Sequence, residues 1–324
     1  MTVWPVRALA GAVAALLAAC SGPEAARVTA APVALEPGRP AVRTAGELAF
    51  AGGWVLEAKG VRRFGGLSDL EWLGPGRFEL ITDRGDAVEL SFPADGAGRL
   101  GADGRARIRP LAAARCGGGG PGRRDAEDLA AVPGQRLVSF ERDHRIVEAD
   151  RCGPRLPFPP LSPELNHGIE ALAFEEAEPG PRRYVAGAED GRLWRCGMEP
   201  GEGCELLYTG GPPDGRGRWV LRSLDGLAGR GALVGVWRQW TGRHGRAAVT
   251  LFEPDARGGL GMRTLAVLDE RYNIDNFEGI SAEPRPGGGW RFWLVSDDNF
   301  SARQRTLLMA FDWPGRPMNR RPGT

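Results

Sequence analysis

The sequence has few of the residues on which serine- or histidine-based hydrolytic sites depend. Its 324 residues include three histidines, His144, His167 and His244. No GxSxG or SxxK run occurs in the chain, which disfavours a serine-esterase mechanism and leaves Ser68 as a weak candidate nucleophile. Among the histidines, His167 is the best-placed general base, because it precedes Glu170 closely. The simpler interpretation is a turn histidine that forms local hydrogen bonds.

The chain also lacks a long hydrophobic segment and an excess of charge. The longest apolar run, Ala8 to Ala19, is shorter than the ~20 residues that a membrane-spanning helix needs. The formal net charge is +1, with acidic and basic residues interspersed. Neither a nucleic acid nor an anionic membrane surface is therefore implied as a partner.

The first residues are typical of a bacterial lipoprotein signal. Arg7 precedes the apolar run, and Leu17-Ala18-Ala19-Cys20 resembles a lipobox. We predict a signal peptide over residues 1–19 and lipidation of Cys20, which makes the membrane a partner through the lipid. The alternative is plain secretion with Cys20 inside the signal. Ser21 in place of aspartate favours a periplasm-facing protein on the outer membrane of a Gram-negative cell envelope.

Four cysteines follow Cys20, an even number in a chain predicted to reach an oxidising compartment. Cys196 and Cys204 flank a Gly/Pro-rich turn, so we expect them to pair and to leave Cys116 with Cys152. A metal site is the less favoured interpretation, because no close CxxC pair is present.

Composition divides the remaining chain into three parts. Residues 20–43 are rich in Ala, Pro and Val, which predicts a flexible tether. Residues 44–316 read as short strands separated by Gly, Pro, Asp and Arg clusters, with helices scarce. Residues 317–324 are expected to be a disordered tail. The length allows one propeller or barrel, or two smaller domains, and we expect a monomer.

One pattern recurs along the strand-rich part: an acidic turn and then a hairpin. The five copies begin at GGLSDLEW (65–72), DAEDLAAV (125–132), HGIEALAF (167–174), SLDGLAG (223–229) and NFEGISAE (276–283). This spacing suits a four-stranded propeller blade, since such blades bury their faces only against neighbours. A β-sandwich would not repeat the acidic turn.

The repeats predict an all-β fold, a β-propeller. We expect residues 47–61 to combine with the C-terminal strand at 306–313 into a sixth, ring-closing blade. Six blades are therefore favoured over five or seven.

Several motifs resemble those of the phytase-like family, which is described as having esterase-like activity. They are GGLSDLEW with ITDRGD, DAEDLA with SFER, NHGIEAL, and EGI followed by LVSDDNF. The resemblance runs from about Phe64 to Trp313. It implies the fold more firmly than the reaction. In the fourth copy the family's acidic residue is missing, and only Arg238 matches.

The acidic position of each copy predicts a carboxylate ring at one end of the channel. The candidate metal ligands are Asp69, Glu127, Glu170, Asp225 and Glu278, joined by Asp297 from a neighbouring turn. Oxygen ligands in this number suit Ca²⁺. The alternative is that these acids accept backbone N–H bonds between blades.

A second ring follows from the ends of the next strands, where carboxylates alternate with arginines. The candidate catalytic residues are Asp83, Arg84, Arg142, His167 and Glu170. Guanidinium groups beside a cation suit an anionic small-molecule ester. The leading hypothesis is a Ca²⁺-dependent hydrolase of an ester or phosphoester. The alternative is a non-enzymatic binding or scaffold propeller of the cell envelope, in which the metal is structural and the arginines are clamps.

Overall fold

Strands form nearly all of the regular structure. The computed structural model describes residues 23–116, 124–161, 168–175, 183–199, 201–211, 213–240 and 245–315. Within these ranges the helical structure is a single 3₁₀ turn, η1 (Ala113–Arg115). No helix there is long and apolar enough to cross a membrane. The predicted signal peptide, Cys20 and the tail at 317–324 lie outside the described residues.

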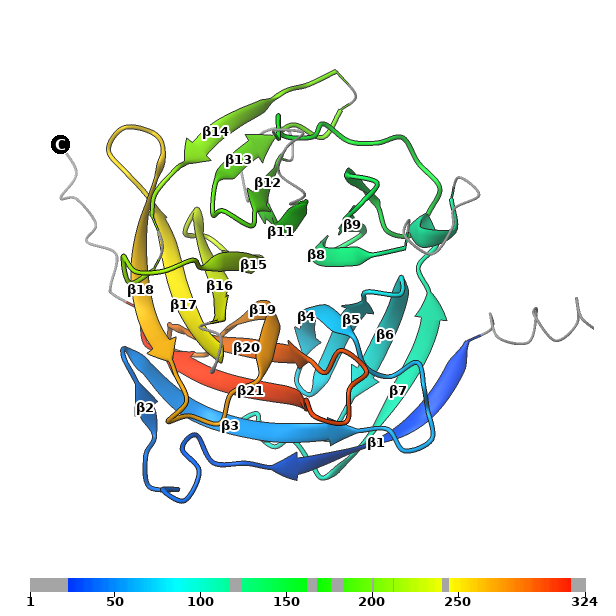
Figure 1. The fold of residues 1–324 in the computed structure, drawn as a ribbon, viewed down its shortest axis with the longest axis vertical. Helices are drawn as coiled ribbons and strands as arrows, with labels where there is room; N and C mark the ends of the chain where they lie inside the picture. Colours follow the sequence, from blue (N-terminus) through cyan, green and yellow to red (C-terminus); the bar gives the residue numbers. More distant parts are fainter. Residues whose placement is uncertain are drawn as a thin grey trace, which may run out of the picture.

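The strands form blades around a central channel (Figure 1). Blade one is β4 (Leu67–Gly74), β5 (Arg77–Thr82), β6 (Asp86–Ser91) and β7 (Asp103–Pro110). Blade two has three strands among the described residues, β8 (Ala126–Val132), β9 (Gln135–Phe140) and β10 (Arg145–Glu148). Blade three is β11 (Ile169–Glu175), β12 (Arg183–Ala188), β13 (Leu193–Cys196) and β14 (Cys204–Tyr208).

Blade five draws its outer strand from the other end of the chain. Blade four is β15 (Val220–Leu227), β16 (Ala232–Trp240), β17 (Gly245–Pro254) and β18 (Leu260–Leu268). Blade five is β19 (Asn276–Pro284), β20 (Trp290–Asp297), β21 (Thr306–Trp313) and β3 (Leu48–Glu57), with the two-residue β2 (Thr44–Ala45) beside β3. β21 pairs antiparallel with β3, so that the two ends of the domain close the ring.

The preference for six blades is wrong. The innermost strands β4, β8, β11, β15 and β19 surround the channel in that order, and each contacts the next (Figure 1). The segments at 47–61 and 306–313 do pair as expected, but they complete the blade of the fifth copy. Over the described residues the propeller therefore has five blades, one for each repeat.

The predicted flexible tether is also wrong over its described part. β1 (Glu24–Pro32) pairs antiparallel with both β3 and β7 and joins blades five and one into one ten-stranded sheet. Ala26, Val28 and Ala30 alternate with exposed residues and are buried. Small side chains at every second position are enough to pack an outer strand, although a low content of bulky residues had suggested disorder.

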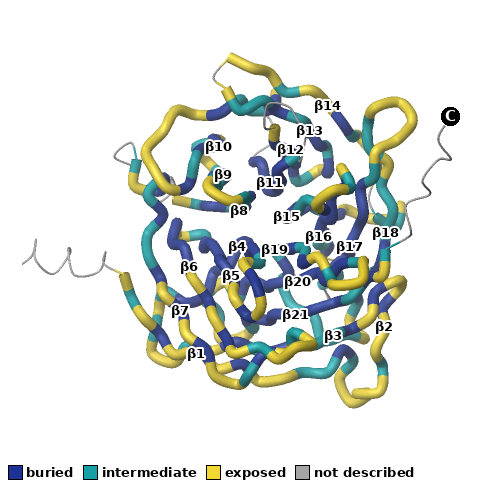
Figure 2. The backbone as a smooth tube through the Cα atoms, turned by 180° about the vertical axis from the view of Figure 1, so that it is seen from behind, coloured by how far each residue is buried: buried dark blue, intermediate teal, exposed yellow. Residues whose placement is uncertain are grey.

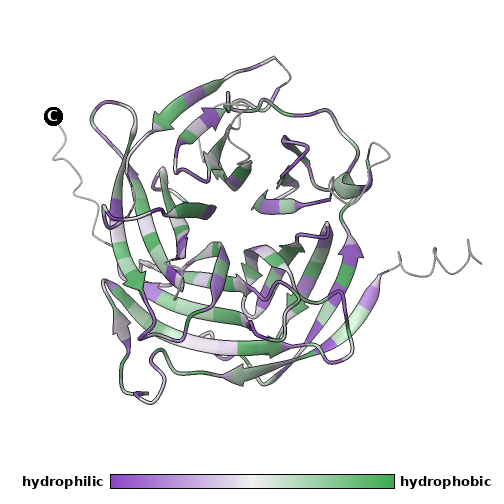
Figure 3. Ribbon diagram, viewed as in Figure 1, coloured by the Kyte–Doolittle hydropathy of each residue, from purple (hydrophilic) through white to green (hydrophobic). Residues whose placement is uncertain are grey.

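The hydrophobic core is divided among the seams between blades. Separate clusters of buried residues fill the seams between blades one and two, two and three, three and four, four and five, and five and one. In Figure 2 the inner parts of the blades are buried and the outer loops are exposed, and Figure 3 shows apolar residues along the strands. Trp194, Trp237 and Trp293 pack in these seams, whereas Trp240 is 70% exposed.

Both predicted disulfides form. Cys116–Cys152 joins the turn after blade one to the segment that follows blade two, and its Cα atoms lie 5.5 Å apart. Cys196 and Cys204 are register partners on β13 and β14, with Cα atoms 4.1 Å apart.

Candidate functional site: an acidic channel mouth

A β-bulge near the start of each innermost strand sets the geometry of one channel end. The register of β4, β8, β11, β15 and β19 with the second strand of each blade shifts at this point. Each bulge lies just before a buried apolar residue: Leu70, Leu129, Leu172, Leu224 or Ile280. The residues two positions earlier are Ser68, Glu127, Glu170, Arg222 and Glu278. A bulge re-aims side chains, and this end of the channel is called the acidic mouth below.

Arg222 organises the carboxylates of the acidic mouth. Its guanidinium forms ion pairs with Glu170, with Glu189 at 3.5 Å and with Glu278 at 3.1 Å. Burial alone would lower the pKa of Arg222, but these carboxylates raise it above its usual value. Arg238 also pairs with Glu278. Arg222 was missed in the sequence because the fourth copy was aligned on Asp225. When the copies are aligned on their buried apolar residues, Arg222 occupies the position equivalent to Glu170.

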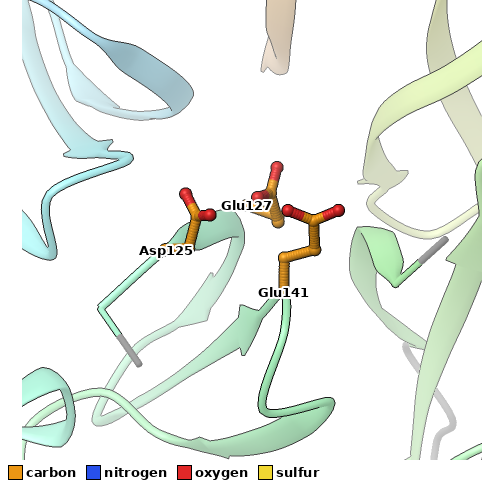
Figure 4. A group of neighbouring side chains, drawn as sticks. All are labelled: Asp125, Glu127 and Glu141. Carbon is orange, nitrogen blue, oxygen red and sulfur yellow. The ribbon is translucent and has the colours of Figure 1, made fainter. Parts of the chain in front are cut away.

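Three carboxylates beside Arg222 form a candidate cation site. Asp125 precedes β8, Glu127 lies on β8 and Glu141 follows β9, and their side chains converge (Figure 4). One oxygen from each lies within 4.8 Å of the others. Burial raises the pKa of all three groups, and neighbouring carboxylates raise those of Glu127 and Glu141 further. Hard oxygen donors that repel one another fit a Ca²⁺ ion, which would remove the repulsion.

Asp83, Arg84 and Arg142 lie at the rim of this mouth. Burial raises the pKa of Asp83 to about 6, Arg84 opposes the shift, and Asp125 adds to it. Asp83 Oδ1 is buried without a hydrogen-bond partner among the described residues. The Arg84 guanidinium stacks 3.3 Å from the centre of the Phe300 ring. Arg142, with its side chain 67% exposed, pairs with Asp125 at 3.1 Å.

Two further predicted site residues, Glu170 and Asp297, belong to the mouth. Glu170 is 2% exposed, and burial raises its pKa to about 7 although Arg222 opposes the shift. Asp297 ends β20, and burial raises its pKa to about 7 despite a hydrogen bond from the Asn299 N–H. His167, the predicted general base, lies outside the described residues.

Asp69 does not line the mouth. It is 1% exposed, one layer below the bulges, where it interacts directly with the fully buried Asp128. Asp69 accepts hydrogen bonds from Leu129 N on β8 at 3.1 Å and from the Ser223 hydroxyl on β15 at 2.9 Å.

Asp128 and Ser223 complete the same layer. Asp128 Oδ2 accepts from Leu172 N on β11 at 2.5 Å and Leu224 N on β15 at 3.3 Å, and Ser223 Oγ accepts from Ile280 N on β19 at 3.1 Å. Innermost strands expose unpaired edge amides to the channel, and these side chains satisfy them. Asp69 therefore has the alternative role considered for the acidic ring, an acceptor of backbone N–H groups between blades.

Asp225 lies at the opposite end of the channel. It follows the buried Leu224, and its Oδ2 accepts from Ala282 N of β19 at 2.7 Å. The expected single ring of five carboxylates is thus distributed over three levels: the mouth with Glu127, Glu170 and Glu278, the buried layer with Asp69, and the far end with Asp225. The reason is that Glu127, Glu170 and Glu278 lie within the bulges, whereas Asp69 and Asp225 come after theirs.

The fold and the site define a five-bladed propeller with one acidic channel end, and the comparisons agree with the family resemblance. Residues 62–207 match the family described as Phytase-like: Esterase-like activity of phytase. This match confirms the resemblance over the first three blades, but it ends before the last two copies, to which the motifs had extended it. A search of curated proteins finds no match.

Similar solved structures are distant. They include YCF48 bound to D1 peptide (12% identity, 76% of this chain and 91% of that chain covered, TM-score 0.35). Raptor from Chaetomium thermophilum gives 11% identity, coverage of 83% and 27%, and a TM-score of 0.40. The Cps50 (Swd1) beta-propeller domain from Myceliophteria thermophila gives 12% identity, coverage of 87% of this chain and 95% of that chain, and a TM-score of 0.32.

Proposed function

We propose that the acidic mouth binds Ca²⁺ and hydrolyses an ester or phosphoester. The observation that carries the proposal is the cluster of Asp125, Glu127 and Glu141, whose oxygens converge within 4.8 Å. Ca²⁺ takes about 6–8 oxygen ligands, so positions remain for water and for a substrate oxygen. The family match to a phytase-like domain supports hydrolysis of this class.

The residues at the rim supply the remaining chemistry. Bound Ca²⁺ would polarise the ester or phosphoryl oxygen. Asp83 is the best-suited general base, because its raised pKa of about 6 allows it to accept a proton near neutral pH and one of its oxygens has no partner. Arg84 and Arg142 are exposed and would bind the anionic oxygens of the substrate. Glu170, held by Arg222, positions the neighbouring carboxylates.

A binding propeller with a structural metal is the second candidate. It is favoured by Arg222 and Arg238, whose guanidinium groups are held by Glu170 and Glu278 as clamps between blades. In this case the mouth would bind Ca²⁺ without turnover.

Thermal melting with Ca²⁺ and with chelator separates the two candidates when it is combined with a hydrolysis assay. A ligand at 100 times its Kd stabilises the native state by about 2.7 kcal/mol, which raises the Tm by about 5–10 °C at ~2–4 °C per kcal/mol. We expect Glu127→Gln to abolish this rise and Glu205→Gln, at an exposed outer carboxylate, to retain it. No Ca²⁺-dependent rise in the wild type would refute the metal site.

The substrates for the assay are p-nitrophenyl phosphate and p-nitrophenyl acetate. We expect Ca²⁺-dependent turnover that Asp83→Asn reduces by about 10²–10⁴-fold, the usual contribution of a general base, while its Ca²⁺-dependent Tm rise remains. A Ca²⁺-dependent Tm rise without turnover of either substrate would favour the binding propeller.

We further propose that the protein is an exported lipoprotein anchored through Cys20 and facing the periplasm. The two disulfides support an oxidising compartment. Mass spectrometry of the N-terminal peptide should find acyl chains on Cys20, and fractionation should place the protein in the outer membrane. An unmodified Cys20 in mature protein would refute the anchor.

A further inference from the structure

A pocket lies beside the acidic mouth, on the seam between blades four and five. Its volume is about 710 Å³, within the ~300–1,000 Å³ typical of small-molecule sites. The end of β16, the start of β17, the segment from Glu270 to Asn276 and the turn between β20 and β21 form its wall. Arg238 connects this wall to the acidic mouth, because it pairs with both Asn276 and Glu278. The pocket is called the seam pocket below.

One side of the seam pocket is aromatic. Trp240 is 70% exposed, the highest exposure of any large hydrophobic side chain among the described residues. Its register partner on β17 is Gly245, which lacks a side chain that could cover the indole ring. Tyr272 and Ile274 also line the pocket, and both pack against the core between blades four and five. A ligand that covers the Trp240 ring would remove a large apolar surface from water.

Part of the polar side of the seam pocket is already occupied by contacts within the protein. Gln239 Nε2 donates to Arg216 O at 3.1 Å, and Gln239 Oε1 accepts from Arg246 at 2.7 Å. Asp275 Oδ2 accepts from Arg305 N at 3.1 Å and from Arg305 Nε at 3.2 Å. These two side chains therefore shape the wall and are not counted as ligand contacts.

The remaining polar groups offer both donors and acceptors. Asn276 Oδ1 accepts from the guanidinium of Arg238, so its Nδ2 group remains as a donor. Asn299 Nδ2 donates to Gln304 Oε1 at 3.1 Å, which leaves the Asn299 carbonyl oxygen and the Gln304 amide nitrogen. The lining further includes the hydroxyl of Tyr272 and the exposed carboxylate of Glu270. A ligand that both donates and accepts suits this mixture.

We propose that the seam pocket binds a neutral saccharide. A sugar ring combines an apolar face of C–H groups with a rim of hydroxyls, each of which donates and accepts. The apolar face stacks on Trp240, and the hydroxyls bond to Asn276 and Glu270. An anionic ligand would meet Glu270, and a cationic ligand would meet Arg238. The site adjoins the acidic mouth, but the assignment does not rest on the proposed hydrolysis.

Calorimetric titration of the mature protein with cellobiose, maltose and N,N′-diacetylchitobiose tests the proposal. Sorbitol has the hydroxyls of a sugar without the ring, and benzyl alcohol has a ring without the polyol. We expect at least one disaccharide to bind with 1:1 stoichiometry and at least tenfold more tightly than sorbitol or benzyl alcohol. Binding of none of the three disaccharides, or equal affinity for sorbitol or benzyl alcohol, would overturn the proposal.

Substitutions in the wall locate the bound sugar. Trp240→Ala should reduce the affinity at least tenfold, whereas Trp240→Tyr keeps an aromatic ring and should lose less. Tyr272→Phe removes only the hydroxyl and should reduce the affinity about two- to tenfold, the usual contribution of one hydrogen bond. Leu206→Ala changes a side chain that is 50% exposed on the outer strand β14 and should leave the affinity unchanged. Circular dichroism verifies that each variant is folded.

Two results would place the sugar outside the seam pocket. The first is an unchanged affinity in Trp240→Ala, a substitution at an exposed strand end. The second is loss of sugar binding when the titration of the wild type is repeated with chelator, since this would locate the sugar on a cation at the acidic mouth. We expect chelator to leave the affinity for the sugar unchanged.

Discussion

Replacement of Asp128 by alanine should destabilise the propeller more than any surface change, because this side chain connects three blades. Its carboxylate accepts hydrogen bonds from Leu129 N at 2.8 Å, Leu172 N at 2.5 Å and Leu224 N at 3.3 Å. Each buried N–H left without an acceptor costs about 1–3 kcal/mol. Leu129 N keeps Asp69 as an acceptor at 3.1 Å, so two N–H groups lose theirs, and we expect a loss of about 2–6 kcal/mol, or ~4–24 °C in Tm at ~2–4 °C per kcal/mol.

Two comparisons separate this effect from a general loss of charge. Asp128→Asn keeps one acceptor oxygen and should lose less stability than Asp128→Ala. Asp103→Ala removes an exposed carboxylate that pairs with Arg27 at 2.9 Å and should change the Tm little, since exposed ion pairs contribute about 0–1 kcal/mol. Urea unfolding and calorimetry measure all three. If Asp128→Ala were as stable as Asp103→Ala, the buried carboxylates would not hold the innermost strands together.

Two further outcomes follow from the structure. Burial raises the pKa of Glu71 well above 4.5, and the nearby carboxylates Asp225 and Asp69 raise it further. The contribution of Glu71 to the stability of the folded protein is therefore complete below pH 4.5 and is lost as the pH rises through the raised pKa. Because Gln cannot ionise, the Tm of Glu71→Gln relative to wild type should increase with pH above 4.5; a difference independent of pH would contradict the shifted pKa. Removal of Cys116–Cys152, which spans 36 residues, should cost about 1 kcal/mol more than removal of Cys196–Cys204, which spans 8, because the longer loop restricts the unfolded chain more. Urea unfolding of the two double-serine variants measures this, and the reverse order would contradict the loop-entropy argument.

The repeats predicted the fold well because each copy encodes a complete local unit. The turn, the innermost strand and the returning strand lie close together in sequence, and strand periodicity and turn residues are local signals. The number of blades depended instead on where residues 48–57 pair, which is a contact between the two ends of the chain. No local pattern distinguishes the outer strand of blade five from the start of a sixth blade.

The sequence predicted one ring of carboxylates, but the structure places these residues at different levels of the channel. Glu127, Glu170 and Glu278 do share the acidic mouth, whereas Asp69 and Asp225 lie deeper along the channel. A shift of one residue past a bulge turns a side chain from the mouth to the buried layer. The bulges are visible only in the strand register, so acidic residues that look equivalent in sequence differ in position.

Two innermost strands approach each other so closely at the channel that one of them needs a glycine there. In the sequence, this glycine is the only sign of the contact. A Cβ atom at Gly279 on β19 would lie 2.7 Å from the Cα atom of Asp69 on β4. Blades five and one therefore meet backbone to backbone at the channel, and a larger residue would push them apart. The acidic residue Glu278 is placed at the mouth by the same bulge.

The pairing of β3 with β21 also affects the order of folding. β3 is made early, and β21, its partner in blade five, is made almost last. Until Thr306–Trp313 is available, β3 has an unpaired edge, as does β20. Contacts between distant parts of a chain form slowly, so the half-made propeller is exposed to intermolecular strand pairing for longer than a fold built only from local hairpins. A chain that ends before Thr306 would keep these edges permanently open.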